Sequence, residues 1–284
     1  MGLLDGKVAV ITGGTRGLGL GIAQAFARDG AAVVVASRSQ KSVDQSVQQL
    51  LAEGARASGM VVDVSSLEQV QALAQHAISH FGRLDIWVNN AGTAGPYGPT
   101  LDFDPKDFVQ VVQTNILGVY YGSRTALSHF VAQRSGKLIN LLGHGYNGPV
   151  PWQNAYGSSK AWVRAFTKAL AEETKESGVG VFAFNPGMVL TELLTDVDVF
   201  EGSEPRLKNF PAVVRMWAKP AEFPAQKAVW IASSATDGKT GLLVSLFSPV
   251  TMLQGALKEG WRVLLGKPAP DMDLHIKTIA PYRD

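Results

Sequence analysis

Tyr156 and Lys160 lie four residues apart in the stretch that ends at residue 160. If this stretch is helical, both side chains lie on one face and can point into one pocket. A phenol with an ordinary pKa of about 10 is a poor acid at neutral pH. A nearby ammonium group stabilises the phenolate and lowers that pKa, so the pair predicts a site that transfers a proton. The alternative is a solvated pair on a surface helix.

A glycine-rich turn follows the first predicted strand, residues 7–12. Gly13, Gly17 and Gly19 occur here, and the helical pattern that follows runs to about Arg28. Glycines allow backbone amides to approach a pyrophosphate, which then lies at the positive N-terminus of a helix. The spacing is Gly-x-x-x-Gly-x-Gly and not the Gly-x-Gly-x-x-Gly dinucleotide fingerprint, and a plain tight turn is the alternative. Its position after the first strand favours a dinucleotide cofactor.

The end of the second predicted strand, residues 32–37, indicates which nucleotide binds. A carboxylate at this position would bond the ribose hydroxyls of NAD and repel a 2′-phosphate. The chain has Ser37 and Arg38 here instead, and Arg16 in the glycine-rich turn. Two guanidinium groups that converge on a phosphate favour NADP(H). An arginine that only keeps the surface soluble is the alternative.

Strands and helices alternate along most of the chain. The predicted strands are residues 7–12, 32–37, 58–62, 84–88, 137–142, 179–184 and 241–247. The predicted helices end near residues 28, 53, 81, 117, 132, 177 and 233. Parallel neighbouring strands need such helical crossovers, so the sequence predicts an α/β fold with one doubly wound parallel sheet between two layers of helices. No inter-domain linker is found, which predicts a single cofactor-binding domain, residues 1–247, and a C-terminal extension, residues 248–284, with one helix near 250–265.

The bulk composition limits the class of protein. The 284 residues include 26 basic and 24 acidic ones, and the net charge of +2 is too small and too dispersed for a nucleic-acid-binding or membrane-surface patch. No run of about 18 apolar residues predicts a transmembrane helix, and the first residues do not resemble a signal peptide. The absence of cysteine excludes disulfides, thiolate metal sites and cysteine nucleophiles. A cytoplasmic protein without a metal site is expected.

Four motifs occur in order along the chain. They are Thr12-Gly13…Gly17-Leu18-Gly19, Asn89-Asn90-Ala91-Gly92, Tyr156…Lys160 and Pro186-Gly187…Thr191. In this combination the chain resembles the short-chain dehydrogenase/reductase family. The resemblance implies a Rossmann-type fold that binds a nicotinamide cofactor. Together with the turn and strand residues above, it implies cofactor contacts at Gly13, Thr15, Arg16, Gly17, Leu18, Gly19, Ser37, Arg38, Asp63, Val64, Asn90, Ala91, Gly92, Lys160, Pro186, Gly187, Val189 and Thr191.

The resemblance also implies roles for individual positions. Asp63 matches the residue that meets the adenine, and residues 90–92 match the wall of the fourth strand that faces the cofactor. Pro186, Gly187 and Thr191 match the segment that holds the nicotinamide carboxamide. Asn115 matches the asparagine that breaks a helix and supports a water relay to the lysine. An asparagine in the middle of a helix is mildly unfavourable in any protein, which independently marks this position.

One position departs from the family pattern. The usual serine, thirteen residues before the tyrosine, is replaced by Gly143. Loss of a hydrogen-bond donor to the reacting carbonyl costs roughly 3–4 kcal/mol if nothing replaces it. Three explanations remain open: another donor (His144, Tyr146 or Asn147) reaches the carbonyl, a bulky substrate is held by its periphery while Gly143 makes room, or the chain binds NADP(H) without turnover.

A narrower resemblance concerns three stretches, residues 143–151, 155–160 and 186–194. They are similar to the chlorophyll b reductase branch of the family, which is also glycine-rich where the serine is expected. That branch reduces a formyl group on a large tetrapyrrole. The resemblance therefore favours the second explanation, a bulky substrate.

In this family the substrate lid follows the Pro-Gly segment, here at about residues 192–220. Its apolar residues predict either a pocket wall or plain packing onto the sheet: Leu193, Leu194, Val197, Val199, Phe200, Phe210, Val213, Met216 and Trp217. Apolar residues of the extension, from Trp261 to Leu265, can cover the pocket or a neighbouring subunit. The resemblance implies a homodimer or homotetramer packed through residues 104–132 and 155–177. The apolar residues there are either interface or core: Phe108, Val111, Val112, Trp162, Val163 and Phe166.

These observations predict an NADPH-dependent reductase, reversible in principle, that acts on an aldehyde or ketone of a bulky apolar or aromatic small molecule. Tyr156 supplies the proton, Lys160 lowers its pKa and contacts the nicotinamide ribose, and Asn115 holds a relay water. The alternative from another class is a catalytically silent NADP(H)-binding sensor or interaction protein. The alternative substrate is the formyl group of a tetrapyrrole.

Overall fold

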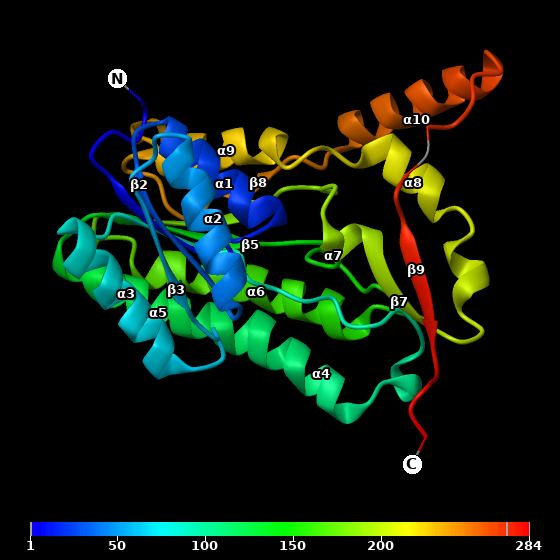
Figure 1. Cartoon of the computed structure of the whole chain (residues 1–284), viewed down its shortest axis with the longest axis horizontal. Helices are drawn as coiled ribbons and strands as arrows, with labels where there is room; N and C mark the ends of the chain where they lie inside the picture. Colours follow the sequence, from blue (N-terminus) through cyan, green and yellow to red (C-terminus); the bar gives the residue numbers. More distant parts are fainter. Residues whose placement is uncertain (1, 271, 284) are drawn as a thin grey trace.

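The computed structural model describes residues 2–270 and 272–283, and its core is one sheet of seven parallel strands (Figure 1). The strand order is β3-β2-β1-β4-β5-β6-β8. The bounds are β1 Val8–Thr12, β2 Ala32–Ser37, β3 Ala57–Val61, β4 Ile86–Asn89, β5 Gly136–Leu141, β6 Val179–Asn185 and β8 Leu243–Ser245. With β1 paired to both β2 and β4, the sheet is doubly wound, as predicted.

Helices cover both faces of this sheet (Figure 1). α1, α2 and α9 lie on one face, and α3, α5 and α6 lie on the other. The bounds are α1 Gly17–Arg28, α2 Gln40–Ala52, α3 Leu67–Phe81, α4 Pro105–Val112, α5 Gly118–Ala132, α6 Asn154–Glu173, α7 Glu192–Thr195, α8 Phe210–Trp217, α9 Glu222–Ala232 and α10 Pro249–Leu264. Short 3₁₀ turns occur at Thr100–Asp102, Glu204–Leu207 and Ser234–Thr236. The three-layer Rossmann-type architecture is therefore confirmed.

The core has two halves because successive side chains of a strand point to opposite faces of the sheet. On β1, Ala9 and Ile11 pack with apolar residues of α1 and α9. Val8 and Val10 pack on the other face, with apolar residues of α3 and α5. All five residues of β1 are buried, which is typical of a parallel strand covered by helices on both faces.

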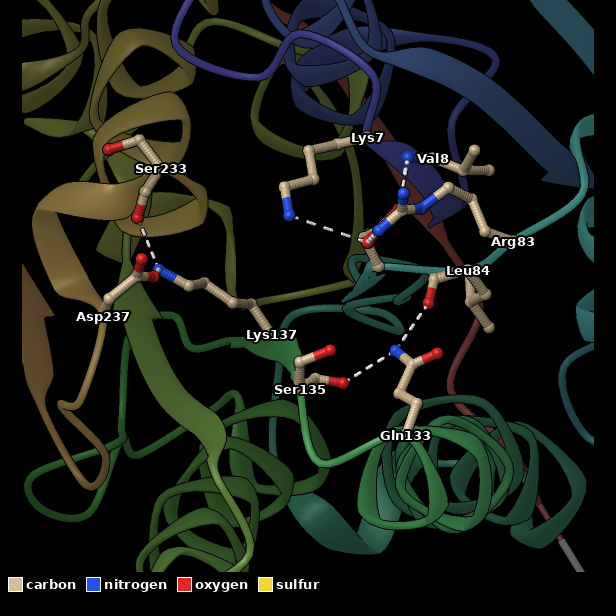
Figure 2. A network of polar contacts seen from close by, with 10 residues as sticks. Lys7, Val8, Arg83, Leu84, Gln133, Ser135, Lys137, Ser233 and Asp237 are labelled. Carbon is tan, nitrogen blue, oxygen red and sulfur yellow. Dashed lines mark hydrogen bonds and ion pairs between the residues drawn. The ribbon is translucent and has the colours of Figure 1, made fainter.

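Polar contacts tie the amino ends of the strands together (Figure 2). Asp85, just before β4, accepts a hydrogen bond from the Val8 amide at 2.9 Å and pairs with Arg83 at 2.6 Å. Lys137 of β5 pairs with Asp237 at 2.8 Å. The predicted functional motifs follow the carboxyl ends of the strands, so the opposite end of the sheet is left for these structural contacts.

The helix predicted at residues 105–117 is not a continuous α-helix. α4 ends at Val112, and Gln113–Leu117 forms one π-helical turn that leads into α5. Asn115 lies at the centre of this turn and is fully buried. A π-helical turn inside a helix is rare and frequently marks a functional site.

The extension contains a strand that the sequence pattern did not predict. β9, His275–Ile279, pairs in parallel with β7, Asp196–Phe200, inside the predicted lid. Tyr97 joins the lid as well, since its amide donates to the carbonyl of Asp198 at 2.8 Å. Four of the five β9 residues are exposed, so backbone pairing and not a buried face specifies this strand.

The predicted helix of the extension is α10, which packs on α8. α6 ends at Glu173, before its predicted end near residue 177, and β8 is only three residues long. Within the described residues, no helix is both long enough and apolar enough to cross a membrane.

Candidate active site

Lys160 is buried within α6, whose first two turns carry both residues of the Tyr-x-x-x-Lys motif. Its ammonium group donates a hydrogen bond to the carbonyl of Leu141, the last residue of β5, at 3.1 Å. Only 5% of the residue is exposed, and no carboxylate of the described residues pairs with it. The ammonium nitrogen lies 5.6 Å from the centre of the Tyr156 ring. The helical spacing therefore brings the two groups together, as predicted.

The pKa values of this pair are shifted by burial. Burial raises the pKa of Tyr156 to about 12 and lowers the pKa of Lys160 to about 8. In both residues the loss of water disfavours the charged form. The expectation that Lys160 lowers the Tyr156 pKa is wrong for this structure, because desolvation of the phenol outweighs the attraction of the ammonium group. At pH 7 Tyr156 is a neutral phenol and Lys160 is mostly charged.

Gly143 allows the Tyr156 side chain to take its observed position. A β-carbon at residue 143 would lie 2.1 Å from the Tyr156 hydroxyl oxygen and 3.0 Å from its Cζ. Any other residue at this position would therefore displace the tyrosine ring. The Tyr156 hydroxyl occupies the space where the side chain of the expected serine would begin. The sequence marks this position only as a missing serine and does not indicate the contact.

Two of the three predicted substitute donors are held by α6. Asn147 accepts a hydrogen bond from the Arg164 guanidinium, which lies 5.6 Å from the centre of the Tyr146 ring. Tyr146 is half-buried and packs against the apolar cluster that contains Val163. His144 is exposed and makes neither contact, and partial desolvation lowers its pKa, so its ring is neutral at pH 7. Of the three predicted substitutes, His144 is therefore the one that these contacts with α6 do not hold.

Asn115 connects the loop after β4 to α6. Its side chain exchanges two hydrogen bonds with the backbone of Thr93, each 2.9 Å long, and donates a third to the Ser159 hydroxyl at 3.0 Å. A β-carbon at Gly92 would lie 3.3 Å from the Asn115 side-chain oxygen and 3.7 Å from the Lys160 ammonium. The end of β4, the π-helical turn and the Tyr-x-x-x-Lys motif therefore meet at one point.

The glycine-rich turn lies against the same end of β4. The Asn90 side chain donates to the carbonyls of Thr12 and Gly13 at 2.9 and 3.0 Å. The Thr12 hydroxyl accepts the amides of Asn90 and Ala91 at 3.1 and 3.2 Å. Gly13 has a φ of 61°, and a β-carbon there would lie 2.9 Å from the Ala91 Cα. These contacts make the turn and residues 90–92 one rigid surface, in which the role of the Thr12 hydroxyl was not predicted.

This surface fits a dinucleotide cofactor. α1 begins at Gly17 without a side-chain cap, so the amides of its first turn suit a pyrophosphate. The Ser37 hydroxyl at the end of β2 is buried and has no hydrogen-bond partner among the described residues. Such a group needs a partner, and a ribose or its phosphate can supply one. The other residues predicted at the turn are half-buried or buried: Thr15, Leu18 and Gly19.

The two arginines predicted to bind a 2′-phosphate have different surroundings. Arg16 pairs with Glu192 of α7 at 2.8 Å, and both side chains are more than half exposed. Arg38 is exposed, and no ion pair joins it to a described residue. An exposed ion pair contributes at most about 1 kcal/mol. Arg16 can therefore leave Glu192 for a phosphate at little cost.

The remaining predicted cofactor contacts lie on either side of the turn. Asp63 uses one carboxylate oxygen to accept hydrogen bonds from the amide and hydroxyl of Ser65, at 2.9 and 2.7 Å. The other oxygen accepts no hydrogen bond from a described residue. Thr191 closes over the turn, since a β-carbon at Gly17 would lie 3.0 Å from its methyl group. Val64, Pro186 and Val189 are buried, and Gly187 has a φ of 76°. The described residues contain no group of three histidines or carboxylates that could hold a metal ion.

A buried polar network supports the site from behind and was not predicted. The Asn89 amide donates to Asn140 at 2.8 Å and to Ser123 at 3.1 Å, and its oxygen accepts the Trp87 indole N–H at 2.8 Å. Asn140 donates in turn to Thr167 at 3.0 Å. The network joins β4, β5, α5 and α6. Asparagine is depleted in strands, so Asn140 inside the predicted strand 137–142 was the available signal.

Comparison with known proteins agrees with this geometry. The family model described as short chain dehydrogenase matches residues 7–201. The chain belongs to the short-chain dehydrogenase family. The resemblance inferred from the four motifs is confirmed, and the protein is placed among oxidoreductases that use a nicotinamide cofactor.

Two relatives within the family are named for different activities. Glucose 1-dehydrogenase 2 of Bacillus subtilis is 30% identical over 257 residues, which cover 90% of this chain and 98% of that protein. "Probable chlorophyll(ide) b reductase NYC1, chloroplastic" of Arabidopsis thaliana is 38% identical over 204 residues, which cover 65% of this chain. The match spans only 41% of the plant protein. The similarity to the chlorophyll b reductase branch is therefore confirmed for a part of each chain.

Solved structures of the family have the same fold with a cofactor bound. The 3-ketoacyl-(acyl-carrier-protein) reductase from Brucella melitensis complexed with NADH has a TM-score of 0.77 and 31% identity, and the match covers 86% of this chain and 97% of that chain. A variant actinorhodin polyketide ketoreductase with NADPH has a TM-score of 0.76 and 26% identity over 87% of this chain and 97% of that chain. The two family members carry different nicotinamide nucleotides, so the comparison does not select one.

Replacing Lys160 with methionine removes the buried charge. Between about pH 8 and pH 10.5 the unfolded chain binds the lysine proton more tightly than the folded chain, so this lysine makes stability rise with pH across that window. We expect Lys160→Met to raise the free energy of unfolding of the cofactor-free protein by about 2–3 kcal/mol at pH 7 and by much less above pH 10.5. Urea unfolding at both pH values measures the difference, with Lys168→Met on the exposed side of α6 as the control. An equal effect at both pH values would contradict the lowered pKa of Lys160.

Proposed function

We propose that the protein is an NADPH-dependent reductase that converts an aldehyde or ketone to an alcohol, reversibly in principle. The observation that supports this proposal most directly is that Lys160 and Asn115 meet at the end of β4, beside the glycine-rich turn, with Tyr156 next to Lys160. A proton donor, a buried cation and a nucleotide-binding turn then lie at one end of one sheet. This combination suits carbonyl reduction better than hydrolysis or group transfer, for which a nucleophile or metal would be needed.

The proposed chemistry divides between cofactor and chain. A bound nicotinamide supplies the hydride that adds to the carbonyl carbon. Tyr156 supplies the proton to the carbonyl oxygen, and its raised pKa keeps the phenol protonated at neutral pH. Because an alkoxide is a stronger base than a phenolate, this proton transfer is favourable. The Lys160 ammonium, 5.6 Å from the ring centre, stabilises the phenolate that remains.

We propose that Asn115 helps to return a proton to the Tyr156 phenolate through a bound water. Both N–H groups of its side chain are already used, by the Thr93 carbonyl and the Ser159 hydroxyl. The side chain therefore cannot donate to a relay water. We assign this water to the backbone carbonyl of Asn115, while its side chain keeps the π-helical turn in place.

A preference for NADP(H) over NAD(H) is supported by charge. The end of β2 carries Ser37 and Arg38 and no carboxylate. Arg38 is exposed, and Arg16 is held only by an exposed ion pair. Both guanidinium groups are therefore available for a 2′-phosphate.

A bulky apolar or aromatic substrate is supported by the residues around the start of α6, the helix that carries Tyr156. A hollow of about 300 Å³ lies at the start of α6, lined by Pro99, Thr100, Pro149, Val150, Pro151, Trp152 and Asn154. Gly143 contributes no side chain beside the tyrosine, and Leu193 of the lid is 49% exposed. Val199 and Phe200 are buried instead and serve as core. The tetrapyrrole formyl group is one candidate within this substrate class, suggested by the plant relative.

A homodimer or homotetramer packed through α4, α5 and α6 is also proposed. Val111 and Val163 belong to the core and are unavailable for such an interface. The remaining surface is aromatic, with Trp162 stacked on Phe166 at 4.5 Å and Tyr120 40% exposed beside it.

With no cysteine in the chain, we propose the cytoplasm as its compartment.

A silent NADP(H)-binding protein is the second candidate, favoured by the position of the Tyr156 hydroxyl. That hydroxyl fills the space of the expected serine side chain, so the usual second donor to a carbonyl is absent. His144 is the one predicted substitute that α6 does not hold. The two candidates differ in the response to substitution at Gly143.

Removing the Tyr156 hydroxyl tests the proposed proton donor. We expect Tyr156→Phe to reduce turnover about 10²–10⁴-fold, the usual contribution of a positioned acid, without weakening NADPH binding. NADPH oxidation across a panel of aldehydes, ketones and quinones measures turnover, and fluorescence titration measures binding. Tyr120→Phe, on α5, is the matched control. Parental turnover in Tyr156→Phe would refute the mechanism.

Adding a side chain at Gly143 separates the two candidate functions. In a working reductase, Gly143→Ala displaces the Tyr156 ring, and we expect turnover to fall at least about tenfold with NADPH affinity unchanged. In a silent protein, Gly143→Ser moves the Tyr156 ring out of the space of the expected serine and adds the missing hydroxyl, and we expect it to create activity. The same NADPH oxidation panel applied to both variants distinguishes these outcomes. Activity in Gly143→Ser alone would favour the silent protein.

Charge reversal at Arg38 tests the nucleotide preference. We expect Arg38→Asp to weaken NADPH binding by about tenfold or more and to leave NADH binding unchanged or stronger, because a carboxylate repels the 2′-phosphate. Fluorescence titration with both nucleotides gives the ratio. Arg28→Asp, at the far end of α1, is the control. An equal change for both nucleotides would exclude Arg38 from 2′-phosphate recognition.

A further inference from the structure

The outer face of α10 is an apolar surface without a partner in the described chain. Its residues recur at intervals of three and four, so they lie on one side of the helix. Their exposed fractions are 63% for Val250, 62% for Leu253, 54% for Leu257, 60% for Trp261 and 75% for Leu264. Contiguous apolar surface of this kind marks an interaction site in a folded protein. We call these five residues the outer face of α10.

The opposite face of α10 contacts α8 around Gly255. Gly255 is buried there, and a β-carbon would lie 2.4 Å from the Met216 carbonyl oxygen. The Trp217 indole donates to the Met252 carbonyl at 3.1 Å. These contacts fix the rotation of α10 about its axis and leave its outer face uncovered. α10 itself lies at the edge of the molecule (Figure 1).

The charges around the outer face are mainly positive. α10 and the three residues after it, 249–267, contain three basic residues and one acidic residue, and Asp271 and Asp273 follow further along the chain. The acid, Glu259, accepts hydrogen bonds from both Arg215 and Arg262, at distances from 2.9 to 3.1 Å. Lys258 is exposed and has no ion pair with a described residue. No membrane-surface patch was expected from the net charge of the whole chain. That net charge conceals the local excess of basic residues on α10.

A second copy of the chain is a poor occupant for this face. A helix of 16 residues is about 24 Å long, and a strip about 10 Å wide on it has an area of roughly 240 Å². A stable dimer needs about 800 Å² from each partner. Pairing of two α10 helices would therefore supply less than half of the necessary area.

We propose that the outer face of α10 docks on the surface of an anionic lipid bilayer. A helix with leucine and tryptophan on one side and unpaired cations beside them lies in the plane of a bilayer interface and is attracted by anionic headgroups. The leucines enter the acyl boundary, Trp261 lies at the headgroup level, and Lys258 reaches the phosphates. The docking does not depend on the proposed reaction, because it involves no residue of the candidate active site.

Vesicle sedimentation with the full-length protein tests this proposal. The vesicles are pure phosphatidylcholine, or phosphatidylcholine and phosphatidylglycerol in a roughly 2:1 ratio, and no cofactor is added. We expect binding to the anionic vesicles, and a fall of about tenfold or more in the partition coefficient of the triple variant Leu253→Ser/Leu257→Ser/Trp261→Ser. Lys258→Glu should weaken binding to anionic vesicles and leave the weak binding to neutral vesicles unchanged. All four positions are exposed, so the variants should fold normally.

The control is a second triple variant at exposed apolar residues elsewhere, Leu51→Ser/Leu101→Ser/Val131→Ser, which should bind like the parent. Light scattering of each variant gives its oligomeric state. The proposal is overturned if the parent does not bind anionic vesicles, or if both triple variants lose binding equally. It is also overturned if the α10 variant changes only the oligomeric state, which would make the outer face an interface between copies.

Discussion

The buried ammonium group of Lys160 is the interaction on which the geometry of the site depends. A buried cation needs a hydrogen-bond acceptor, and for Lys160 this acceptor is the carbonyl of Leu141. This contact fixes α6 to the end of β5. The same helix carries Tyr156 one turn earlier and Ser159, which accepts a hydrogen bond from Asn115. One anchor therefore sets the spacing of all the proposed catalytic groups. It also leaves the charge poorly compensated, which favours a ligand that brings acceptor oxygens to this point.

The sheet and its flanking helices could be predicted because their signals are local. β1 is a short apolar run buried on both faces, and α3 has its buried residues on one side and Ser66 as its N-cap. β9 has no comparable signal, since its residues are mostly exposed and β7 alone specifies it. Asn115 was recognisable as a helix break. The form of that break, a π-helical turn, depends on Thr93 and Ser159, which lie 22 and 44 residues away in the sequence.

The sequence was enough to predict which residues form the candidate site, but not how buried or how closely packed they are. Helical spacing predicts that Tyr156 and Lys160 are close, whereas the direction of each pKa shift depends on whether water reaches them. Water is excluded here, so both shifts disfavour charge. The type of residue at position 143 was informative, but the 2.1 Å approach to the Tyr156 hydroxyl arises from the packing of β5 against α6. Similarly, Arg16 was predicted as a phosphate ligand, and its ion pair with Glu192 requires the folded lid.

The loop after β4, the proposed lid and the C-terminal extension form one hydrogen-bonded unit. Tyr97 pairs with one edge of β7, β9 pairs with the other over five residue pairs, and the Tyr282 amide donates to the Asp102 carbonyl at 2.9 Å. α8 of the lid is in turn packed on α10. A lid that opens must either break the β7–β9 pairing or carry the extension with it. The second course keeps every backbone hydrogen bond of that pairing, and it moves α10 together with the lid. In the proposed reductase, opening of this lid would therefore be coupled mechanically to whatever holds the outer face of α10.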